Sequence, residues 1–292
     1  MDICIVGING FIGKHFTTYL KNNFHCKIIG IGRGSKFLGV EEIKYIQADI
    51  CDSLFAKYIS DIISNIDIII HLAANISFGN EEDLIKVNSL GTLHVCELAN
   101  IKNVKQIIYM SSIPVIGEPE TYPVTEEHPT KPITLYHTTK LTGEHIILNC
   151  CSKNIIRTIM RISSPIGVGM RQNTIVSTFL ERCRYNENLI LYGKGLRMQN
   201  YVDVRDISEG LSQIIKTSST GIYNIANNYS ISNIDLAKLC IQESGATSQI
   251  KFIGEDKEEG LKWDISIEKA KTVFMYSPQF SVKDTIKWML KK

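Results

Sequence analysis

Tyr136 and Lys140 stand four residues apart, a spacing that places both side chains on one face of a helix. An ammonium beside a phenol favours the phenolate and lowers a pKa that is otherwise about 10. Such a tyrosine can exchange a proton with a hydroxyl or a carbonyl near neutral pH. Upstream, Ser111 and Ser112 follow the apolar run Gln106–Met110. The pattern predicts an acid–base site of Ser112, Tyr136 and Lys140, against the alternative of a helix-surface pair and a serine that only ends a strand.

Three glycines near the start of the chain have the spacing GxxGxxG. The apolar run Ile3–Val6 leads straight into Gly7, Gly10 and Gly13, and a helical pattern follows. A strand that feeds a glycine turn and a helix is typical of dinucleotide-binding folds, with the pyrophosphate at the helix N-terminus. The alternative is an ordinary tight turn. We expect the first cofactor contacts at Gly7, Gly10, Phe11, Ile12 and Gly13.

Strand-like and helical patterns alternate through the first half of the chain. The strand-like runs are Ile3–Val6, Lys27–Ile31, Ile43–Gln47, Asp67–Leu72, Gln106–Met110 and Ile155–Arg161, and the helical stretches include Leu54–Ser64, Leu84–Asn100 and Tyr136–Cys151. This alternation predicts an α/β fold, a Rossmann-type doubly wound parallel sheet. Beyond it we expect a smaller, mixed C-terminal lobe that binds substrate.

The predicted division of the chain follows the change of rhythm after Ser163. Residues 1–163 form the dinucleotide-binding Rossmann domain, and 203–226 pack back onto it. Residues 164–202 and 227–292 form the substrate-binding lobe, at the C-terminal edge of the sheet where open α/β folds bind ligands.

The composition, net charge and cysteine spacing exclude several classes of protein. The chain has 292 residues, 44% hydrophobic and 21% charged, with a formal net charge of +2, so we expect neither a nucleic-acid nor a membrane partner. We recognise no signal peptide and no membrane-spanning run. The eight cysteines are scattered apart from Cys150 and Cys151 and lack metal-ligand spacing, which predicts no metal site and a cytoplasmic protein.

In the order and spacing of its motifs the chain resembles the extended short-chain dehydrogenase/reductase family, the NAD-dependent epimerase/dehydratase group. The resemblance covers nearly the whole chain. It rests on Gly7/Gly10/Gly13, Ala48-Asp49-Ile50, His71-Leu72-Ala73-Ala74, Asn88–Thr92, Tyr109–Ser112, Tyr136/Lys140, Arg161, Tyr201–Asp206, Tyr223-Asn224-Ile225 and Asp264 with Ser266, Lys269 and Ala270.

The resemblance implies roles for residues at matching positions. Tyr136 would be the general acid/base, Lys140 would lower its pKa and hold the nicotinamide ribose, and Ser112 would orient the reacting oxygen. Further cofactor contacts would come from Asp49, Ile50, Leu72, Ala73, Ala74 and Asn88. The implied substrates are nucleotide-activated sugars, with hydride transfer at a sugar carbon, usually C4. The resemblance also implies a homodimer through Leu84–Asn100 and Tyr136–Cys151.

Some positions depart from the family pattern at the cofactor and substrate ends. The second strand ends at Ile31 or Gly32 without the acid common in NAD-binding members, and the cations Arg33 and Lys36 follow. Cations can bind a 2′-phosphate, so NADP is favoured over NAD, which stays open. The expected substrate contacts are Ser164 and Gln199, at positions where the family commonly carries an asparagine and an arginine, and Arg197, which with Lys194 would take over phosphate binding. Their replacement leaves open a substrate that is not a typical nucleotide sugar.

The positions after Ser112 bear on the type of reaction. The family's 4,6-dehydratases carry Asp-Glu there, whereas this chain has Ile113 and Pro114, which predicts that it is not a 4,6-dehydratase. The favoured function is a nucleotide-sugar epimerase. The alternative is an NADPH-dependent reductase of 4-keto-6-deoxy nucleotide sugars. A third hypothesis is a dinucleotide-sensing protein without turnover.

Overall fold

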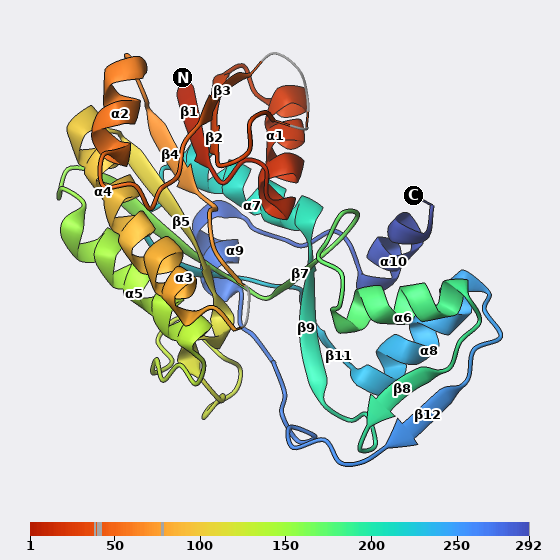
Figure 1. Ribbon diagram of the computed structural model, residues 1–292. Coiled ribbons are helices and arrows are strands. Elements are labelled where there is room, and N and C mark those ends of the chain that lie inside the picture. Colours follow the sequence, from red (N-terminus) through yellow and green to blue (C-terminus); the bar gives the residue numbers. More distant parts are fainter. Residues whose placement is uncertain (38, 40–42, 77–78, 292) are drawn as a thin grey trace.

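The computed structural model describes residues 1–37, 39, 43–76 and 79–291. Its centre is a seven-stranded sheet in the order β10-β6-β5-β4-β1-β2-β3 (Figure 1). All six neighbouring pairs are parallel, as predicted. The strands are β1 (Asp2–Val6), β2 (Lys27–Gly32), β3 (Lys44–Gln47), β4 (Ile68–His71), β5 (Gln106–Ser112), β6 (Ile156–Ile162) and β10 (Gly221–Ile225).

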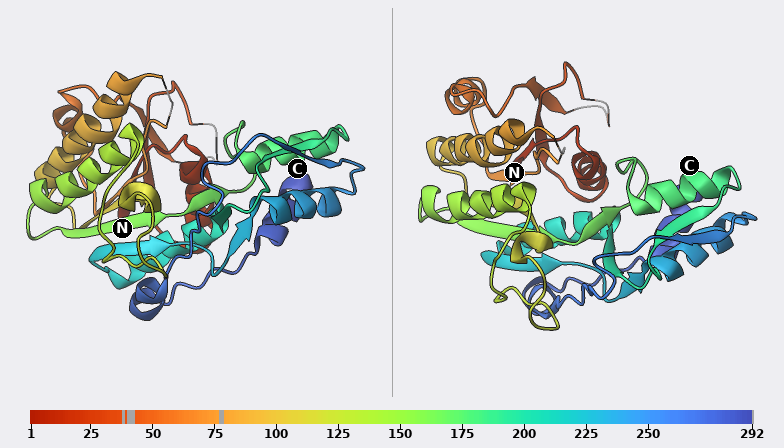
Figure 2. Two further views of the ribbon diagram at one scale, coloured as in Figure 1. Left: turned by 90° about the horizontal axis from the view of Figure 1, so that it is seen from below. Right: turned by 60° about the horizontal axis from the view of Figure 1, so that its bottom comes forward.

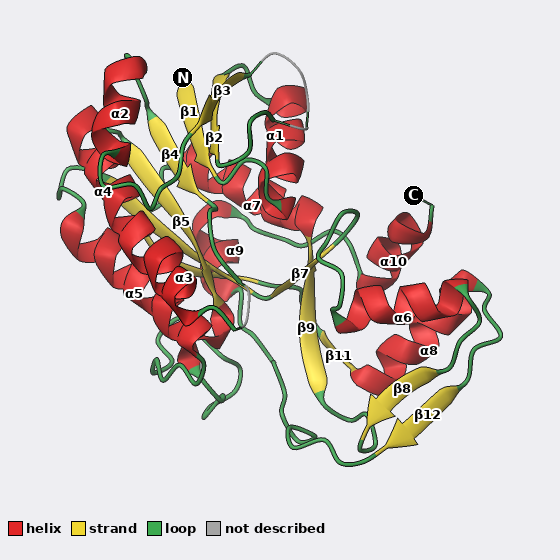
Figure 3. Ribbon diagram, in the orientation of Figure 1, coloured by secondary structure: helices red, strands yellow, loops and turns green. Residues whose placement is uncertain are grey.

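Helices cover both faces of this sheet (Figure 3). On one face α1 (Phe11–Asn23) packs against α7 (Val204–Thr217), and on the other α4 (Gly91–Lys102) packs between α2 (Phe55–Ile62) and α5 (Leu135–Cys150). Alternate residues of β1 enter two separate cores, Ile3 and Ile5 on the α1 side and Cys4 and Val6 on the α4 side. Burial on both faces explains why these strands read as unbroken apolar runs.

One predicted helix is divided. The stretch Leu84–Asn100 falls on α3 (Glu81–Ile85), a π-helical turn over Lys86–Leu90, and the start of α4. Single π-helical turns are often found at functional sites. This turn contains Asn88, one of the residues expected at the cofactor.

The C-terminal lobe is built on two small sheets. One joins β7 (Ser164–Ile166), β9 (Met198–Asp203) and β11 (Ser230–Ser232), and the other joins β8 (Leu189–Tyr192) to β12 (Ile250–Ile253). The lobe helices are α6 (Ile175–Arg184), α8 (Asn233–Ser244) and α10 (Val282–Leu290), while α9 (Glu268–Phe274) packs against β10. Figures 1 and 2 show α6, α8, β8 and β12 on the side of the molecule away from α2, α4 and α5.

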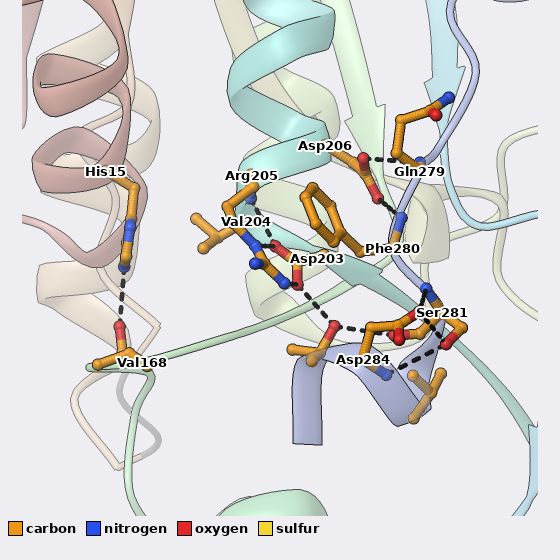
Figure 4. A network of polar contacts seen from close by, with 12 residues as sticks. His15, Val168, Asp203, Val204, Arg205, Asp206, Gln279, Phe280, Ser281 and Asp284 are labelled. Atoms are coloured by element: carbon orange, nitrogen blue, oxygen red, sulfur yellow. Dashed lines mark hydrogen bonds and ion pairs between the residues drawn. The ribbon is translucent and has the colours of Figure 1, made fainter. Parts of the chain in front are cut away.

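A polar network ties α10 to the start of α7 (Figure 4). Arg205 donates from Nε and Nη2 to the buried Asp203, at 2.9 and 2.7 Å, and its guanidinium lies 3.5 Å from the centre of the Phe280 ring. Asp206 accepts backbone N–H bonds from Gln279 and Phe280, at 2.9 and 3.2 Å. Burial raises the pKa of Asp206 to about 6.

Among the described residues, no helix is long and apolar enough to cross a membrane.

Candidate active site

The turn after β1 requires glycine where the chain passes closest to its neighbours. Gly7 has a φ of +89°, and a Cβ placed on it would lie 2.5 Å from the backbone nitrogen of Ala73. A Cβ on Gly13 would lie 2.6 Å from the carbonyl oxygens of Gly7 and Ile8. Within the part of the chain that the structure describes, no side chain caps the N-terminus of α1, which begins at Phe11. The backbone of the first turn of α1 therefore packs directly against the backbone of the glycine turn. Phosphate groups bind at helix N-termini where such backbone N–H groups are free.

A cavity of about 510 Å³ opens beside this turn, and we call it the glycine-turn cavity. It is lined by nine of the residues expected at the cofactor, namely Gly7, Gly10, Arg33, Lys36, Asp49, Ile50, Leu72, Ala73 and Ala74. Asn9 also lines it, and its buried Oδ1 has no hydrogen-bond partner among the described residues. A buried acceptor of this kind suits a hydroxyl donor such as a ribose. The glycine turn, the cations Arg33 and Lys36 and this acceptor are the kinds of group that contact the phosphates and ribose of a dinucleotide.

A second cavity of about 830 Å³ shares Gly7, Gly10, Leu72 and Ala74 with the first, and we call it the catalytic cavity. It is lined by the remaining expected residues except Asn88, namely Phe11, Ile12, Gly13, Ser112, Tyr136, Lys140, Ser164, Arg197 and Gln199. The structure thus brings the predicted acid–base residues and the predicted substrate contacts to one continuous space. These residues come from α1, β5, α5, β7 and β9 and from the segment before β9.

Asn88 lines neither cavity. Its side chain is buried and donates to the backbone oxygen of Asn75 at 2.9 Å and to Thr139 Oγ1 at 3.0 Å. Its Oδ1 accepts from the Asn75 backbone N–H at 2.8 Å. Asn88 therefore joins the loop after β4 to the helix that carries Tyr136.

Desolvation dominates the electrostatics of Tyr136 and Lys140 in the protein alone. Burial raises the pKa of Tyr136 to about 12 and lowers the pKa of Lys140 to about 7, against the opposing effect of the Glu144 carboxylate. The Lys140 ammonium lies 4.2 Å from the centre of the Tyr109 ring. The direction at Tyr136 is opposite to the one expected from a neighbouring ammonium. Without a further cation beside it, Tyr136 is a protonated phenol, the acid form, at neutral pH.

A buried ion pair lies behind these residues. Arg161 donates from Nε and Nη2 to Glu144 at 3.0 and 2.7 Å, and Ser111 Oγ donates to the same carboxylate at 2.5 Å. Ser111 and Arg161 are register partners on β5 and β6, and Glu144 lies on α5. The pair fixes α5, with Tyr136, against the strand that ends in Ser112.

Three polar groups at the catalytic cavity lack a hydrogen-bond partner among the described residues, and two of them were not predicted from the sequence. Ser163 Oγ, Gln199 Oε1 and Trp263 Nε1 are buried without a partner among the described residues, and all three residues line this cavity. Only Gln199 was expected. Trp263 directly precedes Asp264, a position that carries the family resemblance, so a signal lay one residue away. The expected Arg197 is already paired, with its Nη1 at 2.5 Å from Glu258 Oε2.

Comparison with known proteins identifies the class. The model of the NAD dependent epimerase/dehydratase family matches residues 3–226, and the chain belongs to this family. It is similar to the low-salt glycan biosynthesis protein Agl12 of Haloferax volcanii, with 23% identity over 97% of this chain and 96% of the relative. The dTDP-D-glucose 4,6-dehydratase of Mus musculus is 25% identical, over 99% and 88%.

Solved structures confirm the fold. A UDP-glucose 4-epimerase from Thermotoga maritima, solved with UDP-glucose, has a TM-score of 0.88 at 22% identity, over 100% of this chain and 98% of the other. A UDP-glucuronic acid 4-epimerase from Bacillus cereus, solved with UDP-glucuronic acid and NAD, has a TM-score of 0.87 at 23% identity, with the same coverage.

The prediction that the chain is not a 4,6-dehydratase is wrong as an exclusion. Enzymes of that name from mouse and human are 25% and 24% identical over 99% and 98% of this chain, so the similarity extends far beyond the two positions on which the exclusion rested. Ile113 is buried, and Pro114 follows it in a 3-10 turn. An acidic residue at another position, Glu118, lines the catalytic cavity. Two positions after Ser112 therefore do not decide which acids face a substrate.

Proposed function

We propose that this protein is an NAD(P)-dependent nucleotide-sugar epimerase that oxidises and re-reduces a sugar carbon, C4, with Tyr136 as the acid/base. The observation that carries the proposal is the meeting of Ser112, Tyr136 and Lys140 in one cavity that continues into the glycine-turn cavity. The choice of C4 is supported by the names of structurally similar enzymes, which are 4-epimerases.

In this proposal the chain's own residues hold the reactants and move one proton. Residues of the glycine-turn cavity hold a nicotinamide dinucleotide, which supplies the hydride acceptor and donor. With the further cation that the bound dinucleotide would supply, Tyr136 would lose its phenol proton. The phenolate would then take the proton of the C4 hydroxyl as the hydride leaves and return it to the C4 oxygen when the hydride comes back, while Ser112 donates a hydrogen bond to the same oxygen. Lys140, one helical turn beyond Tyr136, supplies positive charge beside the phenol. The intermediate ketone exposes both of its faces in turn, and return of the hydride to the opposite face inverts the configuration at C4.

We propose that the ribose end accepts NADP as well as NAD. Arg33 and Lys36 line the glycine-turn cavity as exposed cations, and each can attract a 2′-phosphate. The unpartnered Oδ1 of Asn9 accepts from a hydroxyl, and so also suits the 2′-OH of NAD. The substrate's diphosphate would meet Arg197, after that residue exchanges its contact with Glu258.

A dehydratase is the second candidate, on the observation that Glu118 lines the catalytic cavity with Ser112 and Tyr136. A ketone at C4 makes the C5 proton acidic, and a carboxylate can then assist loss of water from C5 and C6. Several dehydratases are among the relatives. Reduction of a 4-keto-6-deoxy sugar stays a prediction, which product analysis separates from both.

We further propose a homodimer through α4, α5 and the preceding π-helical turn. Apolar residues are exposed in the π-helical turn, on α4 and at the end of α3 just before the turn: Leu90 is 42% accessible, Ile101 57% and Ile85 50%. In the proposed division of labour, residues 1–163 with 203–226 bind the dinucleotide, and residues 164–202 with 227–292 bind the sugar nucleotide. The proposed location is the cytoplasm.

Replacement of Tyr136 by Phe tests the proposed function. Nuclear magnetic resonance would follow the conversion of UDP-glucose, UDP-glucuronic acid and dTDP-glucose, and calorimetry would follow NAD and NADP binding. We expect Tyr136→Phe to reduce kcat by about 10²- to 10⁴-fold because the proton acceptor is lost, with dinucleotide affinity unchanged. Tyr185→Phe, at an exposed tyrosine just after α6, is the control. Dinucleotide binding without turnover of any sugar by the wild type would instead support the sensing protein.

A further inference from the structure

Residues 167–173 lead from β7 towards α6, and we call them the clasp segment. The backbone oxygen of Val168 accepts a hydrogen bond from His15 Nε2 on α1, at 2.8 Å (Figure 4). Arg171 Nη1 donates to the backbone oxygen of Ile76, in the loop after β4, at 3.1 Å. A segment of the lobe is thus hydrogen-bonded both to the helix after β1 and to the loop after β4.

These two contacts lie just beyond the place where the two cavities meet. The residues that both cavities share are Gly7, Gly10, Leu72 and Ala74. Along the chain, His15 comes shortly after the glycine turn, and Ile76 comes two residues after Ala74. The clasp segment also contributes Met170 and Arg171 to the lining of the catalytic cavity. A ligand that extends from one cavity into the other therefore runs beside the clasp segment.

The clasp segment is held by the lobe near its start. Gly167 packs so closely that an added Cβ would lie 2.8 Å from Val204 Cγ1 and 3.1 Å from the Trp288 ring. Met170 is buried in the core of the lobe. Between them Gly169 has a φ of +82°, and an added Cβ there would meet no heavy atom of the described residues within 4 Å. The segment thus belongs with the lobe, and its backbone has open space between these two anchors.

We propose that the clasp segment closes over a bound nicotinamide dinucleotide and controls the rates at which the dinucleotide enters and leaves. His15 and Arg171 are the positioning residues that hold the segment closed. His15 lines neither cavity, so its imidazole N–H acts on a ligand there through Val168. The inference rests on the dinucleotide binding of the proposed function, and it adds a control of cofactor exchange that is independent of the sugar reaction.

His15→Phe removes the donor and keeps an aromatic ring beside Phe11 and Trp288, whose ring centres lie 5.3 and 5.6 Å from that of His15. Stopped-flow fluorescence would follow the binding of NADH and NADPH and their displacement by an excess of the oxidised form. Loss of a hydrogen bond that holds the segment closed raises the open fraction, which speeds entry and exit alike. We therefore expect association and release to be about fivefold faster, and the Kd to change less than about twofold.

Arg171→Met removes the second contact and keeps an unbranched stem. The double variant should exchange the dinucleotide about 25-fold faster than the wild type, since the two contacts lie on separate elements. Tyr19→Phe is the matched control, because it also removes a hydrogen bond of α1, to Glu209 at 2.5 Å, and Tyr19 lines neither cavity. Its association and release rates should equal those of the wild type.

Unchanged rates in His15→Phe would overturn the inference. Faster release with a Kd weakened in the same proportion would also overturn it, because that result means a damaged binding site and not a more open segment. If His15→Phe does not fold, Arg171→Met, at an exposed residue, carries the same comparison of rates with Kd. Failure of the wild type to bind either NADH or NADPH would overturn the proposed function, and the inference with it.

Discussion

The glycine-turn cavity and the catalytic cavity meet at Gly7, Gly10, Leu72 and Ala74, yet they are assembled in different ways. The first is lined by residues in the ranges 6–14, 31–36, 48–50, 72–74 and 87, which are mostly the ends of neighbouring parallel strands and the turns after them. The second draws on ranges from 7–13 to 258–265, including three loops of the lobe. A cavity built on one supersecondary motif depends on backbone approach, whereas a cavity built from distant segments depends on individual side chains.

Gly7→Ala should give the larger effect of the two backbone tests. The change places a Cβ 2.5 Å from the Ala73 backbone at a φ of +89°, so we expect a loss of at least about 3 kcal/mol in the free energy of unfolding and of dinucleotide binding. Gly245→Ala, at a φ of +69° with no atom within 4 Å, should cost only the backbone strain of about 1–2 kcal/mol. Urea denaturation measures both. Similar losses in the two variants would mean that the close approach at Gly7 is unimportant.

Gln199→Leu tests whether the catalytic cavity depends on side chains. The change removes the donor to Ser164 and the unpartnered Oε1, so KM for the nucleotide sugar should rise about tenfold while dinucleotide affinity is retained. Gln213 on α7 also has an unpartnered buried Oε1 but lines neither cavity, and Gln213→Leu is the matched control. An unchanged KM in Gln199→Leu, measured by steady-state kinetics, would remove Gln199 from the site.

Arg33→Ala should give the smallest effect of these changes. It tests whether the glycine-turn cavity distinguishes NADP from NAD. Loss of the cation should weaken NADP by about fivefold more than NAD, since only NADP carries the 2′-phosphate, and the difference should shrink at high salt. Lys27→Ala, an exposed cation at the opposite end of β2, should change neither affinity. Fluorescence titrations with both dinucleotides measure this, and equal weakening of NAD and NADP would make Arg33 a general surface charge.

The difference between the cavities also explains what the sequence could predict. Of the nine expected residues that line the glycine-turn cavity, Gly7 and Gly10 were predicted from the glycine spacing after an apolar strand, and the other seven from the resemblance to the family or from departures from its pattern. The resemblance could be followed there because the apolar runs mark strands of a sheet buried on both faces. The strands of the lobe are short, as in Ser164–Ile166 and Ser230–Ser232, and carry no periodic signal. Trp263 lines the cavity although it lies far from Ser112 and Tyr136 in the sequence, and no local pattern encodes such a long-range placement.

The direction of the Tyr136 pKa shift and the type of reaction were not predicted correctly from the sequence, for a related reason. The spacing of Tyr136 and Lys140 was informative about position, but burial, a property of the whole fold, sets the direction of the Tyr136 pKa. Likewise, only the two positions after Ser112 were considered as the source of catalytic carboxylates, whereas the acidic residue Glu118 lines the same cavity. The spacing of residues along one helix or at one strand end gives no information about which side chains from distant segments pack beside them.

The most direct test of the central claim follows the hydrogen on C4. The protein would be incubated with UDP-glucose, UDP-glucuronic acid and dTDP-glucose deuterated at C4, quenched rapidly, and its dinucleotide examined by mass spectrometry. The proposal predicts deuterium on the reduced nicotinamide in the wild type and none above background in Tyr136→Phe. Product formed with no deuterium ever reaching the dinucleotide, or equal transfer in Tyr136→Phe, would contradict it.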